Sequence, residues 1–349
     1  MKLAYYGFYN AQSPSGAGIH VYQIVKNLVD LGVDVFSWTD LGIANTQQLP
    51  KNPLLKLLEL RRLNVLYVRL DHSATQGCAF ARGWRRRILS RKLRHVWELN
   101  SLPESRAAYG VSPSDIRAME DRLRQNAPFC DLLICVSDTM SRVAREDFGF
   151  KNVVTIPNAS DPAIFHYDPS KWEKAQPLKV AWIGSAMEPW HNLALIQEAA
   201  QRAREKALNL EFHLAGKGTE DVPNTENLKT YGRVAYEKLP EWLADKHVGV
   251  ICYDQSFARA NSPLKMFDYM AAGLLVLSLQ HPQVSQIVGS LQQLDPIIQD
   301  SDMLVSQLQK VCVDESISEQ AKQLRLAIED TFNWRSNTEA TLEHIRGLC

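Results

Sequence analysis

Short apolar runs alternate with longer amphipathic stretches along this chain of 349 residues. The first run spans residues 3–8, an apolar-periodic stretch covers residues 19–31, and a second run follows at residues 33–38. Runs of this length are typical of buried strands, and the longer period is typical of a helix. A strand, a helix and a strand in this order predict a parallel pair with a right-handed crossover, and therefore an α/β fold.

The alternation forms two series, which a polar, proline-bearing stretch at residues 166–177 separates. At this chain length, two domains of about 150 to 170 residues are expected. We predict a first domain at 1–165, a linker at 166–177 and a second domain at 178–332, with a helix at 333–349 that crosses back to the first domain. The further strands are expected at residues 65–70, 96–99, 132–136, 153–156, 178–184, 211–215, 229–231, 248–253 and 274–278.

The formal net charge is zero, but the charges are unevenly divided. Residues 1–163 carry 21 Lys and Arg against 15 Asp and Glu, a net of +6, and the excess is concentrated at residues 82–94. There, cations alternate with apolar residues in helical spacing. Such a helix either binds anionic lipid headgroups or exposes a solvated basic face. Nucleic acid is not expected as a partner, because no stacking aromatics or recognition motif accompany the patch.

The chain has no apolar run near the ~20 residues that span a bilayer, and its opening is too short for a secretory signal. Its six cysteines lack CxxC spacing, so neither a zinc site nor a disulfide framework is indicated. We therefore expect a cytoplasmic protein without a metal site. If residues 82–94 contact lipid, the protein is peripheral at the inner face of the membrane.

The most informative stretch is the helix expected at residues 262–273. Ser262 is predicted to cap it, Pro263 lies in its first turn, and Lys265 and Asp268 fall on one face. The free N–H groups of such a helix, together with a lysine, favour an anion, and the carboxylate of Asp268 can accept hydrogen bonds from two hydroxyls. A diphosphate beside a ribose matches this combination, which predicts a nucleoside diphosphate sugar as ligand.

Five separated stretches resemble the retaining glycosyltransferases of family 4. They are, in chain order, SGAGIHV at 15–21, VSD at 136–138 with IPNASD at 156–161, IGSAMEPWHN at 183–192, GRV at 232–234 with LP at 239–240, and SPLKMFDYMAAG at 262–273. Each stretch alone is weak evidence, but the five occur in the order of the family, and the resemblance they carry extends over nearly the whole chain. The resemblance implies the GT-B fold, in which two Rossmann-like β/α/β domains face each other across an interdomain cleft.

The chain departs from the family pattern at the donor sugar and the diphosphate. The family has two glutamates eight positions apart; Asp268 matches the second, and Ala260 stands at the first. Asn100 stands where the family has a histidine beside the donor sugar. Ser185 and His191 stand where many members have an arginine and a lysine that neutralise the diphosphate.

In the second domain, the resemblance implies a donor site. Lys265, with Arg259 as a second cation, is expected to neutralise the leaving diphosphate without a metal, and His191 is expected to donate a hydrogen bond to it. Asp268 is expected to bind the ribose. The other expected donor-binding residues are Ser262, Leu264, Gly184, Arg233 and Val234. The simpler alternatives are a local ion pair between Lys265 and Asp268, and a loop histidine without a special role.

In the first domain, Gly16, Ala17 and Gly18 are expected to form a loop that approaches phosphate or acceptor. Gly-x-Gly is a weak motif, and a tight turn is the alternative. Glu98 and Asn100 end a predicted strand, where a parallel sheet delivers side chains to its carboxyl edge. We expect them to be catalytic residues, with Glu98 orienting the acceptor hydroxyl; a carboxylate that only contacts a helix is the alternative.

Together these features predict a metal-independent, retaining glycosyltransferase with no cofactor. Its donor is expected to be a UDP-sugar, with a GDP-sugar second, and its acceptor a glycan or a lipid-linked glycan of envelope or exported polysaccharide synthesis. Two alternatives remain open: a catalytically degenerate protein that binds a sugar nucleotide or glycan, and a GT-B epimerase acting on UDP-N-acetylglucosamine.

Overall fold

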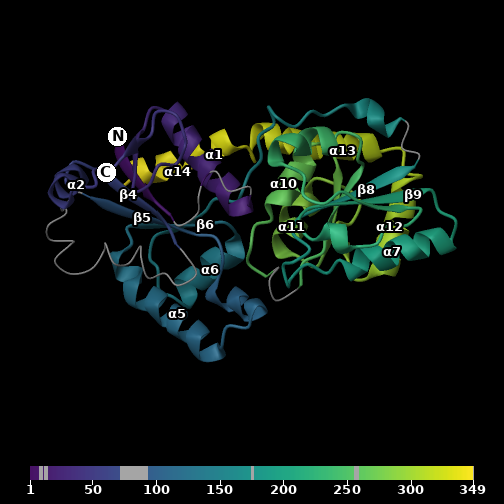
Figure 1. The fold of residues 1–349 in the computed structure, drawn as a ribbon, viewed down its shortest axis with the longest axis horizontal. Helices are drawn as coiled ribbons and strands as arrows, with labels where there is room; N and C mark the ends of the chain where they lie inside the picture. Colours follow the sequence, from purple (N-terminus) through teal and green to yellow (C-terminus); the bar gives the residue numbers. More distant parts are fainter. Residues whose placement is uncertain (8–10, 12–14, 71–92, 174–176, 255–258, 349) are drawn as a thin grey trace. The chain divides into compact units, whose positions relative to one another are not determined.

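The computed structural model describes residues 1–7, 11, 15–70, 93–173, 177–254 and 259–348. The chain divides into two compact units (Figure 1). The first unit comprises Met1–Asn158, Ala260–Ser262 and Trp334–Cys349, and the second comprises Ala159–Arg259 and Pro263–Asn333. Each unit has its own hydrophobic core.

A seven-stranded, wholly parallel sheet forms the centre of the first unit. Its strands, in the order in which they lie in the sheet, are β3 (Gln47–Gln48), β2 (Asp34–Ser37), β1 (Lys2–Tyr6), β4 (Val65–Arg69), β5 (Arg94–Leu99), β6 (Leu132–Cys135) and β7 (Val153–Thr155). Apolar residues on both faces of β4 and β6 are buried, as a sheet covered by helices on both sides requires.

The described α-helices of this unit are α1 (Gly16–Asp30), α2 (Pro53–Leu60), α5 (Pro113–Asn126), α6 (Asp138–Glu146) and α14 (Trp334–Arg346). Figure 1 shows α1 and α14 on one face of the sheet and α5 and α6 on the other. The last helix, α14, packs on α1, and the ring of its Trp334 meets the ring of His20 edge-on at 5.2 Å.

The second unit contains a parallel sheet of six strands. They are β10 (Leu228–Thr230), β9 (Leu210–Ala215), β8 (Leu178–Ile183), β11 (Val248–Ile251), β12 (Leu275–Leu279) and β13 (Ile297–Ile298). The strand order reverses between β8 and β11, and ligands of open parallel sheets bind at the carboxyl edge beside such a point.

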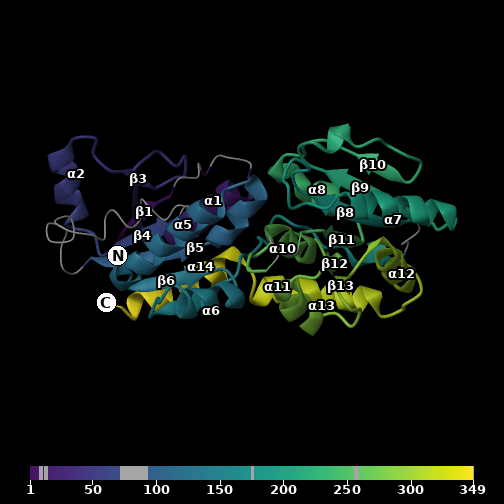
Figure 2. The ribbon, with the colours of Figure 1, turned by 90° about the horizontal axis from the view of Figure 1, so that it is seen from below.

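The α-helices among the described residues of this unit are α7 (Ala194–Glu205), α8 (Leu239–Leu243), α10 (Leu264–Ala271), α11 (Pro282–Ile287), α12 (Ser301–Val311) and α13 (Ile317–Asp330). Figure 1 places α10 and α13 on one face of the sheet and α7 and α12 on the other, and Figure 2 shows the same elements from below. The 3-10 helices of the two units are η1 (Pro103–Tyr109), η2 (Ala127–Phe129), η3 (Pro169–Trp172), η4 (Thr219–Asp221), η5 (Tyr236–Lys238) and η6 (Val288–Ser290).

Two parallel α/β sheets with helices on both faces confirm the predicted fold class. Two predicted helix starts were wrong. The first helix begins at Gly16 rather than near residue 19, because Ser15 caps it and its Oγ accepts the N–H of Gly18 at 3.2 Å. The helix predicted from Ser262 begins at Leu264 instead.

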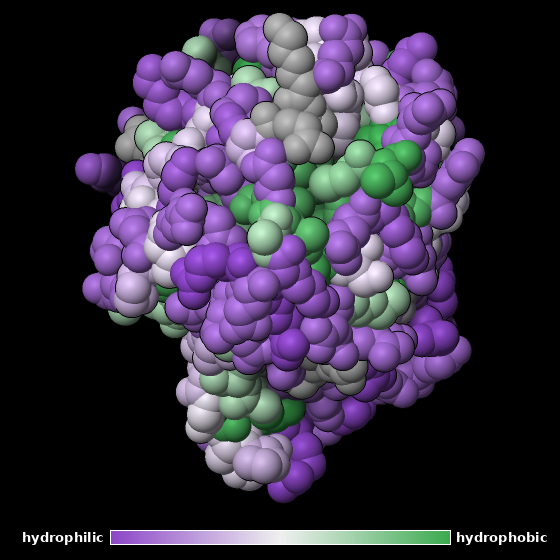
Figure 3. Space-filling model, turned by 90° about the vertical axis from the view of Figure 1, so that its right-hand side faces the viewer, coloured by the Kyte–Doolittle hydropathy of each residue, from purple (hydrophilic) through white to green (hydrophobic). Residues whose placement is uncertain are grey.

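None of the helices in the described ranges combines the length and apolar character needed to cross a bilayer. The face of the molecule drawn in Figure 3 is mainly hydrophilic, with hydrophobic side chains in small patches. The basic helix predicted at residues 82–94 falls almost entirely outside the described residues.

Candidate functional site

A buried lysine on α10 is the centre of the site in the second unit. The side chain of Lys265 is nearly buried, with a residue exposure of 7%. Its Nζ lies 4.7 Å from the centre of the Trp182 ring and 5.0 Å from that of Tyr253, so two aromatic faces stabilise the ammonium by cation–π attraction. Burial lowers the pKa of Lys265 to about 8, which leaves it mostly protonated at neutral pH.

His191 lies beside this lysine and is neutral. Its Nδ1–H donates to the carbonyl of Ser185 at 2.5 Å, and its Nε2 is 3.4 Å from Lys265 Nζ. Because Nδ1 carries the proton, the lone pair of Nε2 accepts from the ammonium. Burial, and then the charge of Lys265, lower the pKa of His191 to about 3. In this arrangement His191 orients Lys265, and the hydrogen bond from its ring to a diphosphate stays a prediction.

Lys265 has no carboxylate partner among the described residues: its contacts there are two aromatic rings and a neutral imidazole. The local ion pair with Asp268 is not formed. Asp268 instead accepts a hydrogen bond from Ser160 Oγ at 2.7 Å, and burial raises the pKa of its carboxyl to about 7. A buried cation without a counter-ion is costly, so this environment favours an anionic ligand.

The first turn of α10 adds backbone donors next to Lys265. Its N-cap is Pro263, which has no side chain that could accept the N–H groups of the turn that Leu264 begins. Ser262 was predicted to supply this cap, and that prediction was wrong. Its Oγ accepts the backbone N–H of Asn158 at 3.1 Å instead, while the Asn158 amide donates to the Ser262 carbonyl at 2.6 Å.

Three glycines leave the carboxyl edge of β8, β9 and β10 without side chains. A Cβ on Gly184 would lie 2.9 Å from Lys265 Nζ, so any larger residue there would displace the ammonium. Gly216 has a φ of 143°, and a Cβ on it would lie 1.5 Å from the Gly184 carbonyl oxygen. Its N–H donates to the carbonyl of Gly232 at 2.6 Å. Glycine is therefore required at Gly184 and Gly216 by close packing, which brings the backbone at this edge next to Lys265.

The remaining predicted donor residues lie at the surface. Arg233 is exposed and Val234 half-buried, directly after Gly232. Arg259 is exposed at the start of the stretch that leads to α10.

A cavity of about 480 Å³ opens at the carboxyl edge of β8, β11, β12 and β13. It shares two residues with the environment of Lys265, namely His191 and Tyr253, whose rings stack at 5.2 Å. The other lining residues are Pro189, Trp190, Asn192, Asp254, Leu279, Gln280, Ile298 and Gln299. Aromatic faces, amides and one carboxylate, with no cation in the lining, suit a neutral polyhydroxylated group better than a second phosphate.

In the first unit, a buried polar chain ends at Glu98. Arg69 Nη1 lies 2.6 Å from Nδ1 of His20, and Nε2 of that ring lies 3.3 Å from Glu98 Oε1. Since an arginine can only donate, Nδ1 accepts and Nε2–H donates to the carboxylate. Tyr67 Oη donates to Glu98 Oε2 at 2.5 Å, and the Asn100 amide also donates to this carboxylate.

Glu98 is 2% exposed and is fully occupied by these neighbours. Burial alone would raise the pKa of Glu98, but His20, Arg69 and the hydrogen bonds outweigh it and lower the pKa. Burial lowers the pKa of His20 to about 3, so the imidazole is neutral. The charges of Arg69 and Glu98 therefore compensate each other across the neutral ring of His20, which hydrogen-bonds to both. We assign Glu98 a positioning role.

This chain also reaches the glycine segment. Arg69 Nη1 donates to the carbonyl of Ala17 at 3.3 Å, while His20 belongs to the next turn of α1. Gly16, Ala17 and Gly18 form the first turn of that helix rather than a loose loop. Arg69 and His20 therefore hold the glycine turn against the sheet edge. Neither residue could be identified from the sequence, because the contacts join residues 49 and 52 positions apart.

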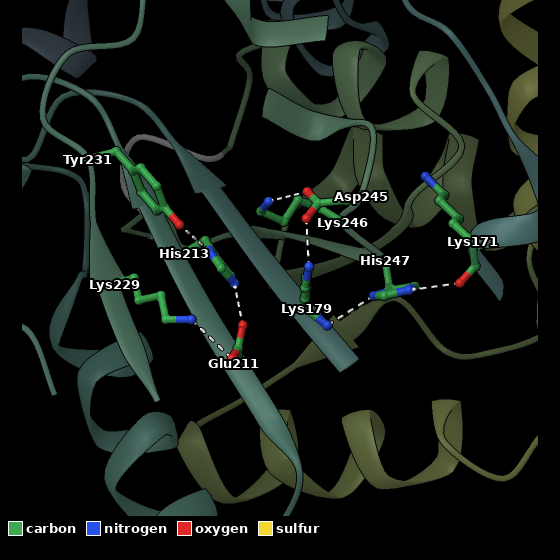
Figure 4. Close-up of polar contacts among 9 residues, drawn as sticks. All are labelled: Lys171, Lys179, Glu211, His213, Lys229, Tyr231, Asp245, Lys246 and His247. Atoms are coloured by element: carbon green, nitrogen blue, oxygen red, sulfur yellow. Dashed lines mark hydrogen bonds and ion pairs between the residues drawn. The ribbon is translucent and has the colours of Figure 1, made fainter. Parts of the chain in front are cut away.

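A second polar network lies in the second unit, at the amino ends of the strands (Figure 4). Lys179 Nζ pairs with Asp245 at 2.6 Å, and the Asp245 carboxylate also contacts Lys246. Glu211 pairs with Lys229 at 3.0 Å and contacts the His213 ring. Both carboxylates are paired with lysines of the network, and the ammonium of Lys171 donates to the backbone carbonyl of Ala272 at 2.7 Å. No group of described residues provides a metal-ligand cluster of His, Cys, Asp or Glu.

His247 in this network makes folding pH-dependent. Its Nδ1 accepts the N–H of Lys179 at 3.0 Å and its Nε2–H donates to the Lys171 carbonyl at 3.1 Å, so a second proton would break the first bond. Burial lowers the pKa of His247 to about 4. Below pH 6.5, His247 therefore becomes protonated in the unfolded chain but stays neutral in the folded one. The free energy of unfolding falls as the pH is lowered from 6.5 to about 4.

We expect His247→Gln to reduce the loss of unfolding free energy between pH 7 and pH 5 by about 1–2 kcal/mol. Urea unfolding at the two pH values measures this difference. The exposed His344 supplies the control, because His344→Gln should leave the loss as in the parent protein. An unchanged pH dependence in His247→Gln would contradict the assignment.

Two family models match the chain. The model of Glycosyltransferase Family 4 matches residues 14–164, and the model of Glycosyl transferases group 1 matches residues 177–314. The first match covers most of the first unit and the second covers most of the second unit, and residues 1–13, 165–176 and 315–349 lie outside both matches. No curated protein sequence matched the chain.

Solved structures of similar fold cover nearly the whole chain. Sucrose-phosphate synthase from Thermosynechococcus elongatus aligns with a TM-score of 0.68 at 16% identity, over 99% of this chain and 98% of that one. A trehalose-6-phosphate protein from E. coli, bound with UDP-2-fluoro glucose, aligns with a TM-score of 0.68 at 13% identity, over 99% of each chain. WaaG, a glycosyltransferase involved in lipopolysaccharide biosynthesis, gives 0.65 at 13% identity, over 99% of this chain and 100% of that one.

Proposed function

Because the chain belongs to the family 4 type of glycosyltransferases with the GT-B fold, we propose that it transfers a sugar, with retention, from a UDP-sugar to a glycan or lipid-linked acceptor. The acceptor class we propose is that of envelope or exported polysaccharide synthesis. One observation carries the donor assignment: Lys265 is a buried ammonium without a carboxylate partner in the described part of the chain.

In this reaction, the bond between the anomeric carbon and the β-phosphate oxygen breaks, and negative charge grows on the diphosphate. Lys265, already ordered between two rings and His191, is positioned to stabilise that charge without reorganisation. The N–H groups of the first turn of α10 add to this stabilisation. We propose that these groups supply the neutralisation that a metal ion would otherwise provide.

Gly184 brings the backbone that follows β8 next to the Lys265 ammonium, and we propose that the diphosphate binds beside this segment. The adjacent cavity, with Trp190, Gln280 and Gln299 in its lining, offers an aromatic face and amides to the hydroxyls of a hexose. The E. coli structure with bound UDP-2-fluoro glucose supports UDP as the nucleotide. Oδ1 of Asp268 accepts a hydrogen bond from Ser160, and we propose that the second carboxylate oxygen accepts from the ribose.

The acceptor hydroxyl forms the new bond to the anomeric carbon and loses its proton to the departing phosphate oxygen. In such a front-face displacement no protein base is required. The arrangement in the first unit agrees with this, because the carboxylate of Glu98 is buried and occupied by Tyr67, Asn100 and His20.

Thermal unfolding with UDP, GDP and ADP tests the donor site. A ligand at 100 times its Kd stabilises the folded protein by about 2.7 kcal/mol, so UDP should raise the melting temperature by several degrees. We expect UDP to stabilise more than GDP, and ADP least. Absence of stabilisation by any of the three would remove the donor assignment.

A second function, binding without transfer, is favoured by Ala260. This residue occupies the family position of the first glutamate, is 6% exposed and belongs to the hydrophobic core of the first unit. Incubation with UDP-glucose and UDP-N-acetylglucosamine separates the candidates. Slow release of UDP indicates a transferase, conversion of the sugar nucleotide to its epimer indicates an epimerase, and binding with neither product indicates a pure binder.

A further inference from the structure

Helix α2 (Pro53–Leu60) presents leucines to solvent on an otherwise ordinary surface helix. Its sequence is PLLKLLEL, and Asn52 caps it by accepting the N–H groups of Leu54 and Leu55 at 2.9 and 3.2 Å. Figures 1 and 2 place α2 at one end of the first unit. The Asn52 cap and the proline at the first helical position are local interactions that stabilise the start of the helix. The helix can therefore form at the edge of the unit, where few tertiary contacts are available.

The helix has two apolar faces, and only one of them is used within the described structure. Leu60 is buried, whereas Leu54, Leu55 and Leu58 are 73%, 55% and 55% exposed. At 100° per residue, these three lie within an arc of about 100°, and Leu57 and Leu60 lie on the opposite side. Large exposed hydrophobics elsewhere in the described chain are separated in sequence, so three on a single short helix form a distinct patch.

Basic residues lie at both ends of helix α2: Lys51 precedes it, and Arg61 and Arg62 follow it, whereas Lys56 lies on the side of the helix opposite the exposed leucines. Lys51, Lys56 and Arg61 form no ion pair with a described carboxylate, and Arg62 has only Glu59 at 3.5 Å. Glu59 is the sole acidic residue between positions 51 and 62, against four cations. Positive charge beside exposed apolar side chains complements the surface of an anionic bilayer, into which those side chains can insert.

We propose that α2 docks on the surface of a bilayer that contains anionic phospholipids. Leu54, Leu55 and Leu58 enter the region below the headgroups, while Lys51 and Arg61 contact the lipid phosphates. The leucines are exposed on one side of the helix and have cations at both of its ends, which fits a fluid anionic surface. This assignment is independent of residues 82–94 and of the donor site, and it predicts a peripheral protein whose first unit faces the membrane.

Vesicle co-sedimentation tests the docking surface. The full chain should bind vesicles of phosphatidylcholine mixed with phosphatidylglycerol, and bind pure phosphatidylcholine weakly. The variant Leu54→Ser/Leu55→Ser/Leu58→Ser should lower the partition coefficient at least tenfold, with unchanged circular dichroism and unchanged stabilisation by UDP. Met187→Ser and Val313→Ser, which alter exposed hydrophobics of the second unit, should bind like the parent chain.

Insertion itself is measured with Leu55→Trp, whose fluorescence should shift to shorter wavelength on addition of the anionic vesicles and stay unshifted with neutral ones. The variant Arg85→Gln/Arg86→Gln/Arg87→Gln separates the two basic segments. If this variant loses binding while the leucine variant keeps it, residues 82–94 bind the membrane and the proposal is wrong. Absence of binding by the parent chain, or a leucine variant that changes only self-association, also overturns it.

Discussion

Replacing Lys265 with methionine should lower kcat/KM for sugar transfer by about 10²–10³-fold, the loss typical of removing one preorganised donor from developing negative charge. Methionine keeps the length and volume of the side chain between the rings of Trp182 and Tyr253. It also removes a buried charge without a carboxylate partner, so stability should be equal to or above that of the parent protein. Loss of function without loss of stability distinguishes a phosphate ligand from a structural lysine.

Two further variants sharpen this test. Lys322→Met, on the exposed face of α13, is the matched control and should leave kinetics unchanged. Gly184→Ala should weaken UDP binding although it leaves Lys265 in the chain, because a Cβ there would lie 2.9 Å from Nζ and push the ammonium away. Steady-state kinetics and UDP titration provide the readouts. A Lys265→Met variant with parental kcat/KM would overturn the donor site.

The fold could be predicted from the sequence because parallel strands covered on both faces appear as continuous apolar runs. β4, β6 and β8 lie within one or two residues of the predicted spans. The edge strands β3 and β13 were not predicted, since two residues are too few to show a period. Their positions are set by neighbours in the sheet rather than by local sequence.

The site was harder to predict, because its partners come together through tertiary packing. Trp182 has the appearance of a core residue of β8, and only the fold brings its ring under a lysine 83 positions later. Ser262 fits a helix cap by local rules, yet Asn158, 104 positions earlier, engages its hydroxyl. Lys265 could be singled out from the sequence, because the first turn of a helix offers free N–H groups to an anion, and its role as a phosphate ligand stays a prediction.

Removing the carboxylate of Glu98 should destabilise the first unit by about 3–5 kcal/mol, because the guanidinium of Arg69 would stay buried without its compensating charge. Glu98→Met is the variant, and its free energy of unfolding is measured in urea. Arg69→Met should cost a similar amount for the converse reason. The double variant should recover part of the loss, because an apolar pair replaces a charge-compensated one.

Activity separates this role from the catalytic role that the strand end first indicated. Glu98→Gln keeps an acceptor for Tyr67 and the shape of the side chain. Below its melting temperature we expect it to retain kcat within a few fold, with a higher KM if the turn at Ala17 loosens through Arg69. A general base would show the opposite result: kcat would fall about 10²–10⁴-fold while stability stayed near that of the parent protein. Since the carboxylate of Glu98 is enclosed by Tyr67, Asn100 and His20, the first outcome is the one that the geometry requires.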